Sequence, residues 1–199
     1  MTRIAWLLAV FVVVGCTGEI GESTGASPPP GAGSAGSSVG GSGMGGGGVV
    51  GGSGGTAPDP FTVAPTCTSG TMWTQGNHGS DDMNPGRACI TCHSMGDGPT
   101  LTIGGTVYPT AHEPDLCNGA NGANGARVVI TGADGQTLTL TPGASGNFNS
   151  RTRVMLPYRA KVTYMGRERA MAAMQTSGDC NNCHTQIGTT SAPGRILLP

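Results

Sequence analysis

Residues 127–141 read RVVITGADGQTLTLT, and this stretch decides the fold class. Two short runs, 127–131 and 136–141, are rich in β-branched residues, which favour strands. Between them stands Ala133-Asp134-Gly135, and an Asp-Gly pair tolerates the positive φ of a tight turn. The stretch therefore predicts a β-hairpin.

Strand signals continue on both sides of this hairpin. Residues 159–165 alternate, with Arg159, Lys161 and Thr163 expected on one face and apolar side chains on the other. Residues 101–108 predict another strand, with a bend or bulge at Gly104-Gly105. Because no long stretch has helical periodicity, the sequence predicts a mainly β fold with little helix.

Several short motifs between Gly105 and about Tyr164 add a family resemblance. Together they resemble the carboxypeptidase-regulatory-like, transthyretin-like β-sandwich family. The resemblance implies a small β-sandwich over about 101–165, acting as a structural or binding module rather than a catalyst. The matching segments are Gly105-Thr106-Val107, Ala126-Arg127-Val128-Val129-Ile130, Gly146-Asn147-Phe148 and Leu156-Pro157-Tyr158.

The composition leaves room for only one modest domain. Of 199 residues, 37 are Gly and 14 are Pro, while 11% are charged, against about 25% in ordinary soluble domains. A formal net charge of -1 gives no basic surface for nucleic acid. No apolar run approaches the roughly 20 residues that span a bilayer. These numbers exclude a large single-core enzyme, a transmembrane protein and an ordinary nucleic-acid binder.

The first 60 residues predict export, a lipid anchor and a tether. Residues 1–15 carry Arg3 and then an apolar run that is typical of a signal peptide. Val13-Val14-Gly15 before Cys16 resembles a bacterial lipobox, which implies lipidation of Cys16; the alternative is an ordinary cleaved signal. Residues 16–60 are rich in Gly and Ser and predict a disordered tether to a domain at 61–199.

The same cysteine–histidine motif occurs twice in this domain and indicates its chemistry. Residues 89–93 read CITCH and residues 180–184 read CNNCH, and C-x-x-C-H is the attachment motif of c-type haem. Two thiols add to the vinyl groups of one porphyrin, and the adjacent His becomes an axial ligand of the iron. The motifs therefore predict two short haem-attachment segments that flank the sandwich and bind two haem c groups. The predicted thioether residues are Cys89, Cys92, Cys180 and Cys183, and the proximal ligands are His93 and His184.

Other uses of these cysteines stay open at this point. Paired C-x-x-C is also zinc spacing, although a zinc site leaves the His after each pair unexplained. Two redox-active disulfides would need a thioredoxin-like context that the chain lacks. Once Cys16 and the four motif cysteines are set aside, Cys67 and Cys117 remain, and in an oxidising compartment they predict a disulfide.

Distal ligands for the two irons come from the remaining His and Met residues. His112 and His78 would complete a bis-His pair on each haem, although either could be a loop residue. Met83, six residues before Cys89, is the next candidate, and Met ligation would raise the reduction potential. A cationic series fits either a solvated strand face or a site for haem propionates or an anionic partner: Arg151, Arg153, Arg159, Lys161, Arg167 and Arg169.

Taken together, the sequence predicts a dihaem c-type cytochrome lipoprotein that carries electrons and is not an enzyme. It would work at the cell envelope, on the periplasmic face of the outer membrane or at the cell surface. Its partner would be a redox protein or an extracellular electron acceptor. Two alternatives remain, a dihaem peroxidase-like enzyme and a non-redox surface-binding sandwich whose Cys clusters hold zinc or disulfides.

Overall fold

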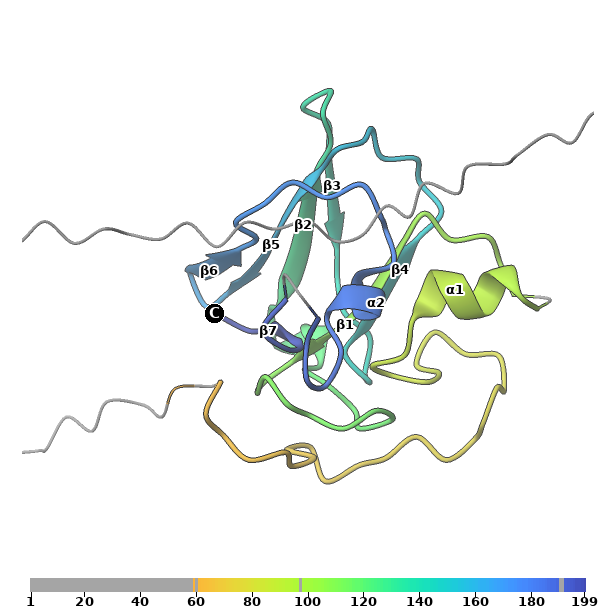
Figure 1. Cartoon of the computed structure of the whole chain (residues 1–199), viewed down its shortest axis with the longest axis vertical. Helices are drawn as coiled ribbons and strands as arrows, with labels where there is room; N and C mark the ends of the chain where they lie inside the picture. Colours follow the sequence, from red (N-terminus) through yellow and green to blue (C-terminus); the bar gives the residue numbers. More distant parts are fainter. Residues whose placement is uncertain (1–58, 60, 97, 190–191) are drawn as a thin grey trace, which may run out of the picture. The chain divides into compact units, whose positions relative to one another are not determined.

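The computed structural model describes residues 59, 61–96, 98–189 and 192–199, and they form a mainly β structure. Figure 1 shows strands gathered around a common centre, with two short helices beside them. The fold class predicted from the sequence is confirmed. The elements are α1 (Cys89–Ser94), β1 (Ile103–Tyr108), the 3-10 helix η1 (Gly122–Asn124), β2 (Arg127–Thr131), β3 (Thr137–Leu140), β4 (Asn147–Ser150), β5 (Arg159–Tyr164), β6 (Arg167–Ala170), α2 (Cys180–Cys183) and β7 (Ile196–Leu197).

The strands form two sheets, with the orders β4-β1-β7 and β3-β2-β5-β6. The predicted hairpin is present, because β2 pairs antiparallel with β3 and Gly135 takes a φ of 77° in the turn. β1 pairs antiparallel with β4 and parallel with β7, so the last strand lies beside the first.

Apolar side chains from both sheets meet in one core. Val162, on the predicted apolar face of β5, is buried there. Burial of apolar surface supplies roughly 25 cal/mol per Å², so this shared core holds the two sheets against each other. The buried members of the core are Ile103, Val107, Val128, Ile130, Phe148, Tyr158 and Val162.

Two details of the predicted strands were wrong. The expected bend at Gly104-Gly105 does not occur, because β1 pairs with β4 from Ile103 opposite Ser150 to Thr106 opposite Asn147 without a skipped residue. The sheets also extend past the expected boundary near 165, since β6 and β7 both lie beyond it. β7 joins the sheet by pairing in parallel with β1, and its two residues form too short a pattern to predict from the sequence.

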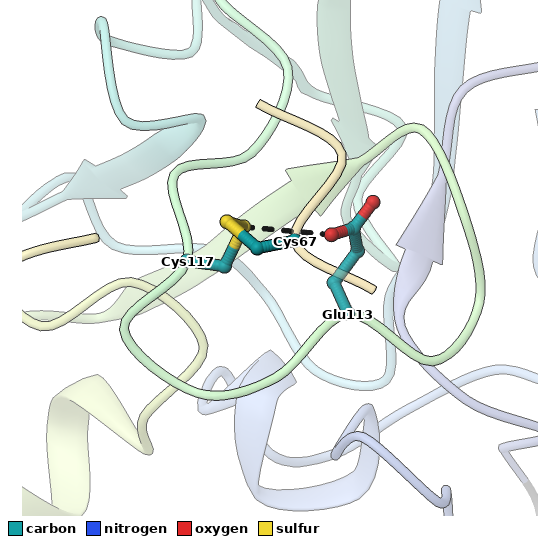
Figure 2. Close-up of side chains that lie close together, drawn as sticks. All are labelled: Cys67, Glu113 and Cys117. Carbon is teal, nitrogen blue, oxygen red and sulfur yellow. Dashed lines mark hydrogen bonds between the residues drawn. A yellow bond between two sulfur atoms is a disulfide. The ribbon is translucent and has the colours of Figure 1, made fainter. Parts of the chain in front are cut away.

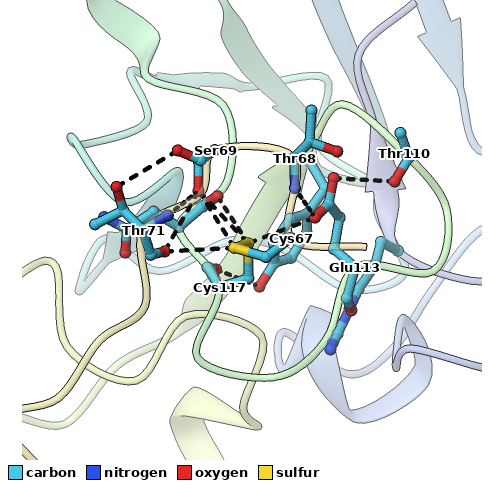
Figure 3. The surroundings of a disulfide bond; sticks show 10 residues. Cys67, Thr68, Ser69, Thr71, Thr110, Glu113 and Cys117 are labelled. Carbon is cyan, nitrogen blue, oxygen red and sulfur yellow. Dashed lines mark hydrogen bonds between the residues drawn. A yellow bond between two sulfur atoms is a disulfide. The ribbon is translucent and has the colours of Figure 1, made fainter. Parts of the chain in front are cut away.

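The predicted disulfide between Cys67 and Cys117 is confirmed, and it spans 50 residues. Figure 2 shows the carboxylate of Glu113 beside the two sulfurs. Glu113 is fully buried, and it accepts hydrogen bonds from the Thr68 amide at 2.8 Å and the Thr110 hydroxyl at 2.9 Å (Figure 3). The disulfide and this carboxylate together fasten the segment before α1 to the loop that follows β1.

The predicted signal peptide, Cys16 and most of the tether lie outside the described residues. Within the part of the chain that is described, no helix is both long and apolar enough to cross a membrane.

Candidate functional site

Both C-x-x-C-H motifs lie against the same strand. α1 carries the cysteines of the first motif and α2 those of the second, and both helices lie beside β1 (Figure 1). A Cβ atom at Gly104 would lie 2.9 Å from the Cβ of Cys89, and one at Gly105 would lie 2.9 Å from the Cβ of Cys180. Real Cβ atoms do not approach so closely. The two glycines of β1 therefore provide the surface on which the two motifs rest.

Side chains in the second motif and directly before it bind the first motif and the segment that leads into it. One carboxylate oxygen of Asp179, Oδ2, accepts hydrogen bonds from the amide and the hydroxyl of Thr91, both at 2.8 Å. The side-chain amide of Asn181 donates to the carbonyl oxygen of Arg87 at 2.9 Å. Asp179 and Asn181 are both buried. The motifs, far apart in sequence, are thus joined through residues of the C-x-x-C-H segments and their immediate neighbours.

Asn181 also anchors the pair of motifs to β1. Its amide oxygen accepts from the backbone N–H of Thr106 at 3.0 Å, and its amide nitrogen donates to the Thr106 hydroxyl oxygen at 3.0 Å. That hydroxyl donates in turn to Asn147 Oδ1 at 2.7 Å. Buried polar groups that all find partners fix one arrangement, because each alternative would leave a group unpaired.

The two motif histidines are held in the same way. Nδ1 of His93 lies 3.0 Å from the carbonyl oxygen of Pro99, and Nδ1 of His184 lies 2.9 Å from that of Gly194. A carbonyl only accepts, so each Nδ1 carries the proton, which leaves the lone pair on Nε2. Burial lowers the pKa of His184, which favours its neutral form. Both imidazoles are therefore set in the tautomer that binds a metal through Nε2.

Burial makes two of the motif thiols, Cys89 and Cys180, difficult to ionise. Cys89, Cys92 and Cys180 are free, whereas Cys183 is not among the free thiols. Burial, with a smaller contribution from Asp179, raises the pKa of Cys89 to about 12, and burial raises that of Cys180 to about 12. Redox-active C-x-x-C pairs instead have lowered thiol pKa values. This environment is the opposite of what a thiol–disulfide exchange centre needs.

Among the described residues, the motif cysteines are not in a group of ligand atoms close enough to share a metal ion. Among the described residues, one group of three or more ligand atoms lies close enough to share a metal ion, and it consists of Cys67, Glu113 and Cys117. Two of its members form the disulfide, which has no thiolate to offer. The ligand atoms of the two motifs do not converge in this manner.

The candidate distal ligands lie in three different settings. His78 is exposed in a loop, and Met83 is half-buried, with its backbone carbonyl accepting from Asn147. His112 has Nδ1 2.6 Å from the carbonyl oxygen of Gln186 and Nε2 3.1 Å from that of Phe61. Both ring nitrogens therefore face carbonyl oxygens, and the contact from Nδ1 is the shorter one. Iron ligation by His112 would require Nε2 to leave Phe61, and it stays a prediction.

Arg195 is a site residue that the sequence reasoning missed. Its side chain is fully buried, and it forms an ion pair with Asp115. It also donates to the carbonyl oxygens of Gly86 at 2.9 Å and His184 at 3.4 Å, so it contacts the backbone near both motifs. A lone cation before a short apolar run gives no signal of this role. The predicted cationic series differs, because its arginines are exposed and Lys161 pairs with Glu168: Arg151, Arg153, Arg159, Arg167 and Arg169.

Comparisons with protein-family models, with curated proteins and with solved structures give no match to this chain.

Proposed function

We propose that this protein is a dihaem c-type cytochrome that carries electrons at the cell envelope, tethered to a membrane through Cys16. Residues 89–93 would hold one haem and residues 180–184 the other. When bound, each haem supplies an iron that accepts and returns one electron. The remaining roles belong to the chain, which fixes the porphyrins, orients the axial ligands and limits access of water.

The proposal rests mainly on the position and the hydrogen bond that His93 and His184 have in common. Each follows its second cysteine directly, and each donates Nδ1–H to a backbone carbonyl. Such a partner fixes the ring and makes Nε2 a better ligand. Neither a structural zinc site nor a disulfide requires a His directly after the second cysteine of each pair. The covalent haem motif explains both the spacing and the tautomer.

The donor set fits two haems, with one requirement. Cys89, Cys92 and Cys180 have free thiols, but the pKa values of about 12 for Cys89 and Cys180 leave few thiolates at neutral pH. Cys183 is not among the free thiols, so its sulfur must be released before it can form a thioether. We therefore expect attachment to precede the closure of the two motifs on β1.

A dihaem peroxidase is less well supported. It needs one iron with an open position and a distal acid/base group beside it. Peroxide reactivity of the reduced protein would separate the two functions, since an electron carrier with two six-coordinate irons should react slowly.

The deciding experiment is the intact mass of mature protein after expression with a cytochrome c maturation system. We expect two covalent haems, and one haem fewer in a Cys92→Ala variant and in a Cys180→Ala variant. Cys67→Ala serves as the control, because it removes a cysteine of the disulfide and should leave haem content unchanged. Protein without pyridine-haemochrome absorbance that binds zinc stoichiometrically would refute the proposal.

The anchor is tested separately. A Cys16→Ser variant should move to the soluble fraction with its haem content intact, because the predicted tether separates the lipid from the domain. Unchanged membrane association would show that Cys16 is not the attachment point.

A further inference from the structure

Asp179 occupies an unusual position between the two motifs. It precedes Cys180 directly, and its side chain binds Thr91 of the first motif. The residue is 5% exposed. Both hydrogen bonds go to the same carboxylate oxygen, Oδ2. This pair of bonds, called the clasp below, connects the residue before the second motif to the first motif.

The second carboxylate oxygen has no such partner. Oδ1 of Asp179 is buried without a hydrogen bond, one of two such side-chain atoms among the described residues. Neither ion pair in the described part of the chain involves Asp179, since one joins Lys161 to Glu168 and the other Arg195 to Asp115. A buried charge that is only partly compensated acts strongly on its neighbours, because the local dielectric is low.

The neighbours that this charge affects belong to both motifs. Burial is the main cause of the raised pKa of Cys89 in the first motif and of Cys180 in the second, and the charge of Asp179 adds to the shift of both, so this charge acts on both motifs. Oxidised haem carries one more positive charge than reduced haem. A nearby carboxylate therefore stabilises the ferric state and lowers the reduction potential.

We propose that Asp179 is a shared positioning residue, whose Oδ2 holds the first motif on the second and whose buried negative charge lowers the reduction potentials of both haems. This inference rests on the proposed function. One buried side chain would thereby shift the reduction potentials of both haems together, whereas an exposed charge is screened by water and salt and would shift each potential only weakly.

The test compares Asp179→Asn with Asp134→Asn in the haem-loaded protein. The side-chain amide introduced by Asp179→Asn still has a carbonyl oxygen that can accept from Thr91, so the clasp is retained while the charge is lost. Potentiometric titration should show both midpoints shifted upward. Asp134 lies exposed in the β2–β3 turn, where water and salt screen its charge, so its variant should leave both midpoints nearly unchanged.

A second variant keeps the test decisive if Asp179→Asn folds poorly. Thr91→Val removes one hydrogen-bond donor from Oδ2 but leaves the charge, so both midpoints should shift downward. In the haem-free chain, an Asp179→Ala variant should exchange its Thr91 amide hydrogen about 10- to 100-fold faster, from the loss of a charge-assisted hydrogen bond.

The possible failures are distinguishable. Haem-loaded variants with unchanged midpoints, or with only one midpoint shifted, overturn the inference and leave the proposed function standing. A wild-type protein that attaches no haem overturns both. Unchanged amide exchange at Thr91 in the Asp179→Ala variant refutes the clasp.

Discussion

Gly105 on β1 offers the sharpest test of how the motifs are seated. A Cβ atom there would lie 2.7 Å from Cζ of Phe148 and 2.9 Å from the Cβ of Cys180. A Gly105→Ala variant must therefore displace the core ring, the second motif, or both. Overpacking of this kind costs about 1–3 kcal/mol, whereas Ala gains about 0.5–1 kcal/mol over Gly in a strand from backbone entropy. The net expectation is a loss of up to about 2.5 kcal/mol, with a central value of roughly 1 kcal/mol.

Denaturant unfolding of the full chain, followed by circular dichroism, measures this loss. Gly79→Ala is the matched control, because a Cβ there meets nothing within 4 Å and the backbone has no positive φ. It should match the wild type or gain up to about 1 kcal/mol. If Gly105→Ala were as stable as Gly79→Ala, the second motif would not rest on β1 as described.

Replacing Cys67 and Cys117 together by Ser should lower the free energy of unfolding by about 4 kcal/mol, because the disulfide closes a loop of 50 residues in the unfolded chain. Reversible denaturation measures this loss. A loss below about 1 kcal/mol would show that Glu113 and its hydrogen-bond partners hold the segment without the disulfide. In haem-free protein, Cys89 and Cys180 have pKa values raised from 9.0 to about 12, so their stabilising contribution is complete below pH 9 and is lost as the pH rises towards 12. The loss of unfolding free energy at alkaline pH should be smaller in a Cys89→Ser/Cys180→Ser variant and in haem-loaded protein, whose thioethers do not titrate. If the haem-free wild type, this variant and the haem-loaded protein lost stability equally, the buried tyrosines Tyr108 and Tyr158 would be the cause. A His112→Ala variant should turn one of two low-spin haems high-spin, and electron paramagnetic resonance with unchanged g-values would instead make His112 a tie between the carbonyls of Phe61 and Gln186.

The sheets were predictable where the pattern is local. The β2–β3 hairpin follows from two β-branched runs around Asp134-Gly135, and β5 follows from strict alternation. Both signals lie within a few residues of the structure that they specify. β7 has two residues, and its partner β1 lies far away in the sequence, so no local pattern announces it.

Gly104-Gly105 shows how a correct signal can be misread. Glycine inside a strand indicates either a bulge or the close approach of another chain segment. The sequence favoured the bulge because nothing nearby suggested a neighbour. The neighbours are Cys89 and Cys180, which lie on separate helices and reach β1 only through the fold.

The clasp between the motifs was beyond sequence reasoning for a related reason. The C-x-x-C-H pattern assigns no role to its two variable positions, yet Thr91 and Asn181 occupy such positions and make the contacts that join the motifs. Thr91 and Asp179 are 88 residues apart. A motif predicts the role of its fixed residues, but it does not predict which residues its variable positions contact in the fold.

The sandwich and the motifs are therefore one unit rather than a binding module with haem segments attached. β1 contributes Ile103 and Val107 to the core and Gly104 and Gly105 to the seat of the motifs. Thr106, on the same strand, completes the buried hydrogen bonds of Asn181. Displacement of the second motif would leave the backbone N–H and the hydroxyl of Thr106 without Asn181 as their partner. Because both motifs rest on adjacent residues of β1, this strand fixes how far apart the two proposed haem sites lie.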